Sequence, residues 1–231
     1  MSEGPFILLA SNSPRRRELI AFGNWTFKVS VPDVDESQYP GETPASYVLR
    51  LAEAKARASL AKAGDAQLIV AADTTVVHDG TIFGKPIDAA EAVQMLKRLR
   101  AHTHQVYTGL AVIKTRTGQL LTDLCVTDVP MRNFADAEIE AYVRSGDPLD
   151  KAGAYAIQHP QFQPVESMSG CFASVMGLPM CHLVRVLARM DISPNANVPA
   201  NCQTSLHYPC PVSAAILLEA PQGAAESRLD N

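Results

Sequence analysis

The stretch LLASNSPRRRELI, residues 8–20, places three arginines directly behind a polar turn. Apolar residues lead into Ser-Asn-Ser-Pro and a helix-like pattern follows, so the stretch predicts a strand, a turn and a helix in that order. The free N–H groups and the positive dipole end at such a helix start favour an anion. Arg15, Arg16 and Arg17 repel one another there, so a negative group is expected to compensate them. The alternative is a solvated basic helix start paired with Glu18 and other carboxylates.

The composition is typical of a globular protein with a substantial core. The chain has 231 residues, of which 47% are hydrophobic and 19% charged, and its net charge is −4. This length fits one domain, with or without a tail. The mixed charge pattern excludes a disordered or coiled-coil composition. The acidic balance argues against a nucleic-acid partner but not against a small anionic ligand.

Targeting signals are not visible in the sequence. No stretch reaches the about 18 apolar residues of a membrane span, and the start of the chain lacks the pattern of a signal peptide. We therefore expect no membrane partner. Five cysteines, odd in number and irregularly spaced, indicate free thiols in a reducing compartment. Together these features predict a cytoplasmic protein.

Strand and helix signals alternate along the chain, which predicts an α/β fold with a mixed sheet. The expected strands are 6–10, 25–31, 68–72, 106–113 and 120–129, and the expected helices are 16–22, 44–64, 88–100, 136–146 and 178–190. A tight hairpin is expected at Asp79-Gly80. From residue 191 onward prolines and polar residues accumulate. We therefore expect a domain over 1–190 and a partly flexible, Pro-rich C-terminal tail over 191–231, with one packed segment at 214–218.

Two charged residues have apolar surroundings in the sequence. Asp73 follows the apolar run 68–72, and a carboxylate at the end of a buried strand is costly unless it is paired or binds a metal. The alternative is a turn aspartate. Lys55 shares a helix face with Val48 and Leu51, so it either snorkels to solvent or neutralises a buried negative group. An apolar side chain at position 55 is expected to suit that face and to keep or raise stability.

Other candidate site residues are ambiguous when taken alone. Glu36 belongs to an acidic cluster with Asp33 and Asp35, which predicts either oxygen ligands for a divalent metal or a solvated loop. Lys85 follows the expected hairpin and is in isolation a loop lysine.

The segment DPLDKAGAYAIQ, residues 147–158, is dense in turn formers. It is either a helix-to-strand connection or a source of site residues. Its candidates are Asp150, Lys151 and Gln158. His102 and His104 alternate on an expected loop, and we interpret both as surface residues.

Taken in order, these segments resemble the Maf family of nucleotide pyrophosphatases. The matching segments are LLASNSPRRRELI, VDES, LAEAKA, VAADTTVV, FGKPID, VYTGLAV, DKAGAYAIQ and MGLPM, which together span roughly residues 6–190. The resemblance implies an α/β fold like that of the inosine-triphosphate pyrophosphatases. Such a fold has a mixed twisted sheet with flanking helices and two lobes around a cleft. The resemblance also implies a homodimer.

The resemblance further implies an activity, the hydrolysis of a nucleoside triphosphate to the monophosphate and pyrophosphate with a divalent metal cation (Mg, Mn or Co). Asp73 would be the general base, and Glu36 and Asp73 would serve the metal. The implied catalytic residues are Glu36, Lys55, Asp73 and Lys85. The implied substrate-binding residues are Ser11, Arg15, Arg16, Thr74 and Gln158.

Within the family, Arg15, Thr74 and Gln158 look like the dTTP/UTP pyrophosphatase branch, in which they would contact the pyrimidine side. Two segments depart from the pattern: His159 replaces the usual glycine, and Ala173-Ser174 stands where an aromatic-Asn pair is familiar. Two alternatives stay open, a 7-methyl-GTP-type pyrophosphatase and a non-catalytic nucleotide-binding regulator of cell division. The presence of both implied metal-binding acids favours catalysis.

Overall fold

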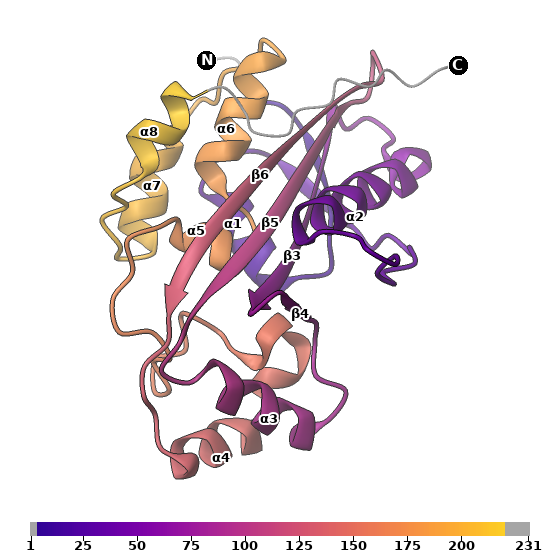
Figure 1. Cartoon of the computed structure of the whole chain (residues 1–231). Helices are drawn as coiled ribbons and strands as arrows, with labels where there is room; N and C mark the ends of the chain where they lie inside the picture. Colours follow the sequence, from indigo (N-terminus) through magenta and orange to yellow (C-terminus); the bar gives the residue numbers. More distant parts are fainter. Residues whose placement is uncertain (1–3, 220–231) are drawn as a thin grey trace.

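The computed structural model describes residues 4–219 and shows an α/β fold built on one six-stranded mixed sheet (Figure 1). The main strands lie in the order β2 (Phe27–Ser30), β1 (Ile7–Ala10), β3 (Leu68–His78), β5 (Thr103–Lys114) and β6 (Gln119–Pro130). Strand β4 (Thr81–Phe83) pairs with the far end of β3. β1 runs parallel to β2 and β3, whereas β3, β5 and β6 are antiparallel neighbours. The predicted α/β class and mixed sheet are confirmed.

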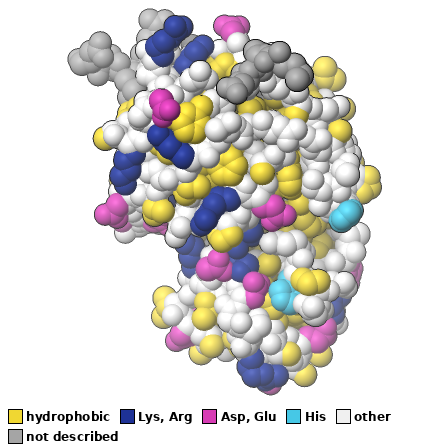
Figure 2. Space-filling model, turned by 180° about the vertical axis from the view of Figure 1, so that it is seen from behind, with side chains coloured by type: hydrophobic (Ala, Val, Ile, Leu, Met, Phe, Trp, Pro, Cys, Tyr) yellow, Lys and Arg dark blue, Asp and Glu magenta, His cyan; other side chains and the backbone are white. Residues whose placement is uncertain are grey.

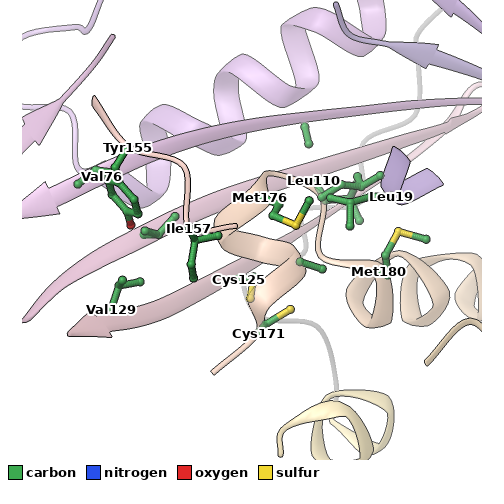
Figure 3. Close-up of a cluster of buried hydrophobic side chains, with 14 of the residues drawn as sticks. Leu19, Val76, Leu110, Cys125, Val129, Tyr155, Ile157, Cys171, Met176 and Met180 are labelled. Atoms are coloured by element: carbon green, nitrogen blue, oxygen red, sulfur yellow. The ribbon is translucent and has the colours of Figure 1, made fainter. Parts of the chain in front are cut away.

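Helices cover both faces of the sheet. Helix α2 (Pro44–Ala58) lies on one face, against β3 and β5. Helices α1 (Pro14–Ala21), α5 (Phe172–Met176) and α6 (Met180–Arg189) lie on the other face. Figure 3 shows part of the core on this second face, where Leu19, Leu110 and Met176 gather. Because both faces are covered, β1 and the first half of β3 are continuous apolar runs.

A smaller lobe lies beyond the far ends of β3, β5 and β6. It contains α3 (Ala89–Leu99), α4 (Asp136–Arg144) and the 3₁₀ turns η2 (Asp147–Asp150) and η3 (Ala152–Ala154), which contact one another (Figure 1). A further 3₁₀ turn, η1 (Leu60–Lys62), follows α2 in the larger lobe. The expectation of two lobes is thus confirmed.

Local sequence signals set the helix starts. The Ser13 side chain caps α1 by accepting from the Arg16 N–H, with Pro14 in the first turn, so this helix begins two positions before its predicted start. Asp88 caps α3 through the Glu91 N–H, as its sequence predicted. The hairpin at Asp79-Gly80 is also confirmed, and both of its residues have positive φ.

The segment after residue 190 contains two helices that pack on α6, namely α7 (Val198–Ser205) and α8 (Ser213–Leu218). Helix α8 coincides with the expected packed segment, whereas α7 was not predicted. Val198 and Ile216 are buried, and Arg185 of α6 donates to the Ile216 carbonyl oxygen at 3.0 Å. The remainder of the expected tail, residues 220–231, lies outside the described residues.

Two further expectations concern the thiols and the membrane. All five cysteines are free, and Cys125, Cys171 and Cys181 are buried. Within residues 4–219, no helix combines the length and the apolar character that crossing a bilayer requires.

Candidate active site

A cavity of about 550 Å³ lies between the two lobes. Its walls come from the β1–α1 turn, α2, β3, the loop after β4, the segment from η2 onward, and the end of α5. It is lined by the predicted catalytic and substrate-binding residues and by the candidates of the 147–158 segment: Ser11, Arg15, Arg16, Glu36, Lys55, Asp73, Thr74, Lys85, Asp150, Lys151 and Gln158. Figure 2 shows basic and acidic side chains gathered at the waist between the larger and smaller parts of the molecule.

Asp73 lies inside β3, which corrects the expectation that it follows the end of a strand. The strand continues to His78, and Asp73 pairs with Gly109 of β5. On the other side of β3, β1 pairs only with 68–70. Asp73 therefore lies in the part of β3 that β1 no longer covers, and this opening lets its side chain line the cavity.

Gly109 allows α2 to approach the sheet closely at this point. A Cβ atom at position 109 would lie 2.5 Å from the Val48 carbonyl oxygen, so no other residue fits without moving the helix. Lys55 is two turns further along α2. The close approach of the helix therefore brings the Lys55 side chain over β3 and toward Asp73.

Lys55 bridges two carboxylates. Its Nζ lies 2.5 Å from Asp73 Oδ1 and 2.7 Å from Glu36 Oε1. Lys55 and Asp73 are 8% and 7% exposed, whereas half of the Glu36 side chain is exposed. Burial alone would raise the pKa of Glu36, but Lys55, Lys85 and Arg16 outweigh it, so the pKa is lowered. The lysine thus pairs with the buried Asp73 and the half-exposed Glu36, which decides against snorkelling.

Arg16 is held by three uncharged oxygens. Its Nε donates to the Gly177 carbonyl oxygen at 2.7 Å, Nη2 to Thr74 Oγ1 at 3.1 Å, and Nη1 to Ser11 Oγ at 3.5 Å. Burial lowers the pKa of Arg16, against the opposing charge of Asp73. Since these bonds leave its charge without a bonded anion, Arg16 is prepared for an anionic ligand.

The other two arginines of the opening stretch have different surroundings. Arg15 Nη1 contacts Asp150 Oδ2 of the smaller lobe at 3.4 Å. Arg17 does not line the cavity; it donates to the Asn12 backbone oxygen at 3.0 Å and is exposed. The arginine cluster is therefore divided between the site and the surface.

Lys151 organises the smaller lobe side of the cavity. Its buried Nζ donates to Asp150 Oδ1 at 2.6 Å and to Asp147 Oδ1 at 3.0 Å, and Asp150 in turn contacts Arg15. Burial would raise the pKa of Asp150, but Lys151 and Arg15 lower it overall. Gln158 and Lys85 are exposed on the cavity walls, where they are accessible to a ligand.

His104 is not a surface loop residue, and that interpretation was wrong. It lies in β5, is 2% exposed, and its Nε2 is 2.8 Å from the Tyr155 hydroxyl. Burial lowers its pKa to about 3. The available signal was the spacing of two residues between His104 and the apolar Val106, which places both on one face of a strand. His102 is exposed, as expected.

Two residues that sequence reasoning missed contact the site residues Thr74 and Arg16. Thr108 is fully buried and lies 3.0 Å from the Thr74 hydroxyl. Gly177 ends α5 with a φ of +112°, and a Cβ there would lie 3.2 Å from Arg16 Nε. Both lie in segments that match the family, VYTGLAV and MGLPM, but their roles were not visible there, because each acts through a partner that is distant in the sequence.

Glu36 and Asp73 are the carboxylates available for a divalent cation. Among residues 4–219, no group of three or more His, Cys, Asp or Glu side chains is arranged to hold a metal. Mg²⁺ commonly uses one or two carboxylates and takes its other ligands from phosphates and water. The two acids therefore fit a cation that binds together with a phosphate ligand.

The fold and the cavity define an α/β protein with an anion-binding cleft, in which basic side chains face a lysine-bridged pair of acids. Over residues 6–190 the chain matches the model of the Maf family, described as Maf-like protein. The chain belongs to the Maf family, and the resemblance inferred from the sequence motifs is confirmed.

Relatives of the chain are similar over most of its length. It is 46% identical over 184 residues to a dTTP/UTP pyrophosphatase of Geobacter sulfurreducens, covering 80% of this chain and 96% of that protein. It is 42% identical over 190 residues to a dTTP/UTP pyrophosphatase of Dehalococcoides mccartyi, with 82% and 84% covered. The solved Ham1 protein of Staphylococcus aureus is only distantly similar, with 14% identity, a TM-score of 0.34, and 55% and 72% covered.

Proposed function

We propose that this chain hydrolyses dTTP, UTP and related or modified pyrimidine nucleoside triphosphates to the monophosphate and pyrophosphate. The observation that carries the proposal is the geometry of one cavity, in which Arg16 and Lys85 share the walls with the Lys55-bridged acids Glu36 and Asp73. The names of relatives that are 42% to 46% identical support the substrate class.

The triphosphate would bind to the start of α1 and the basic side chains around it. Ser11 Oγ and the Arg16 guanidinium lie together at this helix start, where the dipole also favours negative charge. Arg16 forms bidentate contacts with phosphate oxygens, which its planar shape suits. Lys85, on the opposite loop, adds a point charge that neutralises the polyphosphate.

Asp73 acts as the general base in this proposal. Water attacks the α-phosphorus, and its proton passes to the Asp73 carboxylate. The bond from that phosphorus to the α–β bridging oxygen breaks, and pyrophosphate leaves with the electron pair. Lys55 orients the carboxylate through the 2.5 Å contact. The phosphate-binding cations stabilise the charge that develops on the leaving pyrophosphate.

A divalent cation, Mg, Mn or Co, would be held by Glu36 and Asp73 together with substrate phosphates. The chemistry that such a cation supplies when bound is positive charge beside the phosphates and a more acidic water. Lys55 lies between the same two acids and offsets one of their two negative charges, so a net negative charge remains to attract the cation.

Base selection is assigned by resemblance to Arg15, Thr74 and Gln158. Arg15 contacts Asp150 of the smaller lobe, and the segment from Asp150 leads along the cavity wall to Gln158. A base placed against this wall would meet both side chains. The Thr74 hydroxyl differs, because it already contacts Arg16 and Thr108.

We also propose that the protein acts as a cytoplasmic homodimer in nucleotide metabolism, with no nucleic-acid or membrane partner. The net charge of −4 and the five free cysteines support the compartment and the lack of a nucleic-acid partner. The dimer rests on the family resemblance, and light scattering of the purified full chain tests it.

The decisive experiment is a nucleotide panel with product identification. Purified enzyme is incubated with dTTP, UTP, CTP, GTP and 7-methyl-GTP in the presence of Mg²⁺, Mn²⁺ or Co²⁺, and pyrophosphate is distinguished from inorganic phosphate. We expect pyrophosphate, with dTTP and UTP preferred. Asp73→Asn abolishes turnover, whereas Asp79→Asn, on the exposed hairpin, leaves it unchanged. Preference for 7-methyl-GTP, or nucleotide binding without cleavage, would replace the proposal with one of the two alternatives.

A further inference from the structure

A chain of hydroxyl groups runs behind the phosphate-binding arginine. The Thr74 and Thr108 hydroxyl oxygens are 3.0 Å apart, and Thr108 Oγ1 is 2.9 Å from the Ser174 carbonyl oxygen. Thr108 lies on β5 with no exposed surface, and it lines none of the cavity. It therefore has no access to a ligand and acts only through its neighbours.

The hydrogen-bond directions in this chain follow from simple counting. A carbonyl oxygen only accepts, so the single hydroxyl proton of Thr108 goes to the Ser174 oxygen. In the Thr74–Thr108 pair, Thr74 must then donate and Thr108 accept. The Thr74 proton is thereby directed into the protein, and a lone pair of Thr74 Oγ1 accepts from Arg16 Nη2 at 3.1 Å. Each group has its partner, and no alternative direction satisfies all three.

The end of α5 holds the other side of the same arginine. The Gly177 carbonyl oxygen accepts from Arg16 Nε at 2.7 Å. Gly177 has a φ of +112°, and a Cβ there would lie 3.3 Å from Thr74 Oγ1. Two carbonyl groups of one helix end thus orient the guanidinium, Gly177 directly and Ser174 through the two threonines.

We propose that Thr108 is a positioning residue for Arg16 and that it acts through Thr74. Thr108 fixes the rotation of the Thr74 hydroxyl, and Thr74 in turn fixes the plane of the guanidinium that binds phosphate. The proposal rests on the proposed function insofar as Arg16 is a phosphate ligand. It adds phosphate orientation to the role in base selection that resemblance gave to Thr74.

Inorganic tripolyphosphate separates the two roles, because it has the phosphates of the substrate and no base. Its affinity is measured by titration calorimetry with Mg²⁺ for wild type, Thr108→Val and the matched control Thr108→Ser. The Val side chain keeps the shape and removes the hydroxyl, and we expect affinity to fall about five- to tenfold, the value of one hydrogen bond. Thr108→Ser keeps the hydroxyl and should remain within about twofold of wild type.

The base preference gives the second measurement. The ratio of kcat/KM for UTP to that for CTP should be the same in wild type and Thr108→Val, because Thr108 lines none of the cavity and phosphate orientation affects both nucleotides equally. The double variant Thr74→Val/Thr108→Val should bind tripolyphosphate no more weakly than Thr74→Val alone, since both changes break one chain. Additive losses would show two independent effects and overturn the proposal.

A purely structural role for Thr108 would lower the melting temperature and leave tripolyphosphate affinity unchanged, which also overturns the proposal. If Thr108→Val does not fold, Thr74→Val carries the test, because Thr74 is partly exposed at the cavity. In that case wild-type tripolyphosphate affinity in Thr74→Val refutes the proposal. The proposed function alone is refuted if Thr108→Val weakens tripolyphosphate binding as expected but the wild-type protein cleaves no nucleotide.

Discussion

Replacing Lys55 by methionine removes the cation that bridges the two acids of the cavity. The sequence alone suggests that methionine suits this apolar helix face, but the structure reverses that expectation. Asp73 is 7% exposed, and its contact with Lys55 Nζ at 2.5 Å supplies its bonded positive charge. In Lys55→Met the carboxylate remains buried with its partner removed.

The expected loss of stability follows from the burial of the two partners. Removing one partner of a fully buried ion pair costs about 3–5 kcal/mol, because the other charge is left uncompensated. Glu36 is half exposed and the cavity admits water, which lowers the figure. We expect Lys55→Met to lower the free energy of unfolding by about 2–4 kcal/mol near neutral pH.

Urea unfolding of three variants tests this reasoning. Lys97→Met removes a surface lysine whose contact with Asp136 is exposed, and it should cost less than about 1 kcal/mol. The double variant Lys55→Met/Asp73→Asn removes both charges and should recover at least half of the single-variant loss. Wild-type stability in Lys55→Met, or no recovery in the double variant, would show that the Lys55–Asp73 pair does not carry the effect.

Three further predictions concern other parts of the molecule. The pKa of His104 is lowered from 6.5 to about 3, so between these values the unfolded state binds the extra proton and stability falls as pH falls. Between pH 7.5 and 5.5 this proton uptake lowers the free energy of unfolding by about 1.4 kcal/mol. Chemical denaturation should show that pH-dependent loss in His102→Gln, as in wild type, and not in His104→Gln. Gly177→Ala adds a Cβ beside Arg16 and Thr74 at positive φ, so it should weaken tripolyphosphate binding in calorimetry and lower the melting temperature. Gly80→Ala, also at positive φ but with open space around it, should lower only the melting temperature. Truncation after Met190 removes the buried Val198 and Ile216 and should cost about 2–5 kcal/mol in urea unfolding. Because none of the described residues beyond Gly177 lines the cavity, the truncated chain should keep wild-type tripolyphosphate affinity; lost affinity with intact folding would contradict that placement.

Much of the architecture was predictable because local signals set the element starts. The caps at Thr43 and Asp88 and the Asp79-Gly80 turn are each decided by residues within one turn of the chain. The length of β3 was not predictable from the sequence, because the apolar run ends at Ala72 while the strand continues to His78. Pairing with β5 on one side, and not the local pattern, carries β3 through Asp73.

The site was predictable as a set of residues and not as a geometry. Helical periodicity alone placed Lys55 on an apolar helix face, and the structure supplies the buried acid, Asp73, that explains this position. Thr108 and Gly177 could not be found in this way. Gly177 meets Arg16 across 161 positions and Thr108 meets Thr74 across 34. No pattern within one helix or strand encodes such a contact.

Strands β5 and β6 impose a mechanical constraint on the molecule. Each is twelve residues long, about 40 Å at the usual rise of about 3.3 Å per residue, and the two run side by side from the larger lobe to the smaller one (Figure 1). This long strand pair resists bending, since moving the two lobes apart would strain a continuous ladder of backbone hydrogen bonds. We therefore expect the opening between the lobes to change little when a nucleotide binds, so that nucleotides are discriminated by side chains that are already in place.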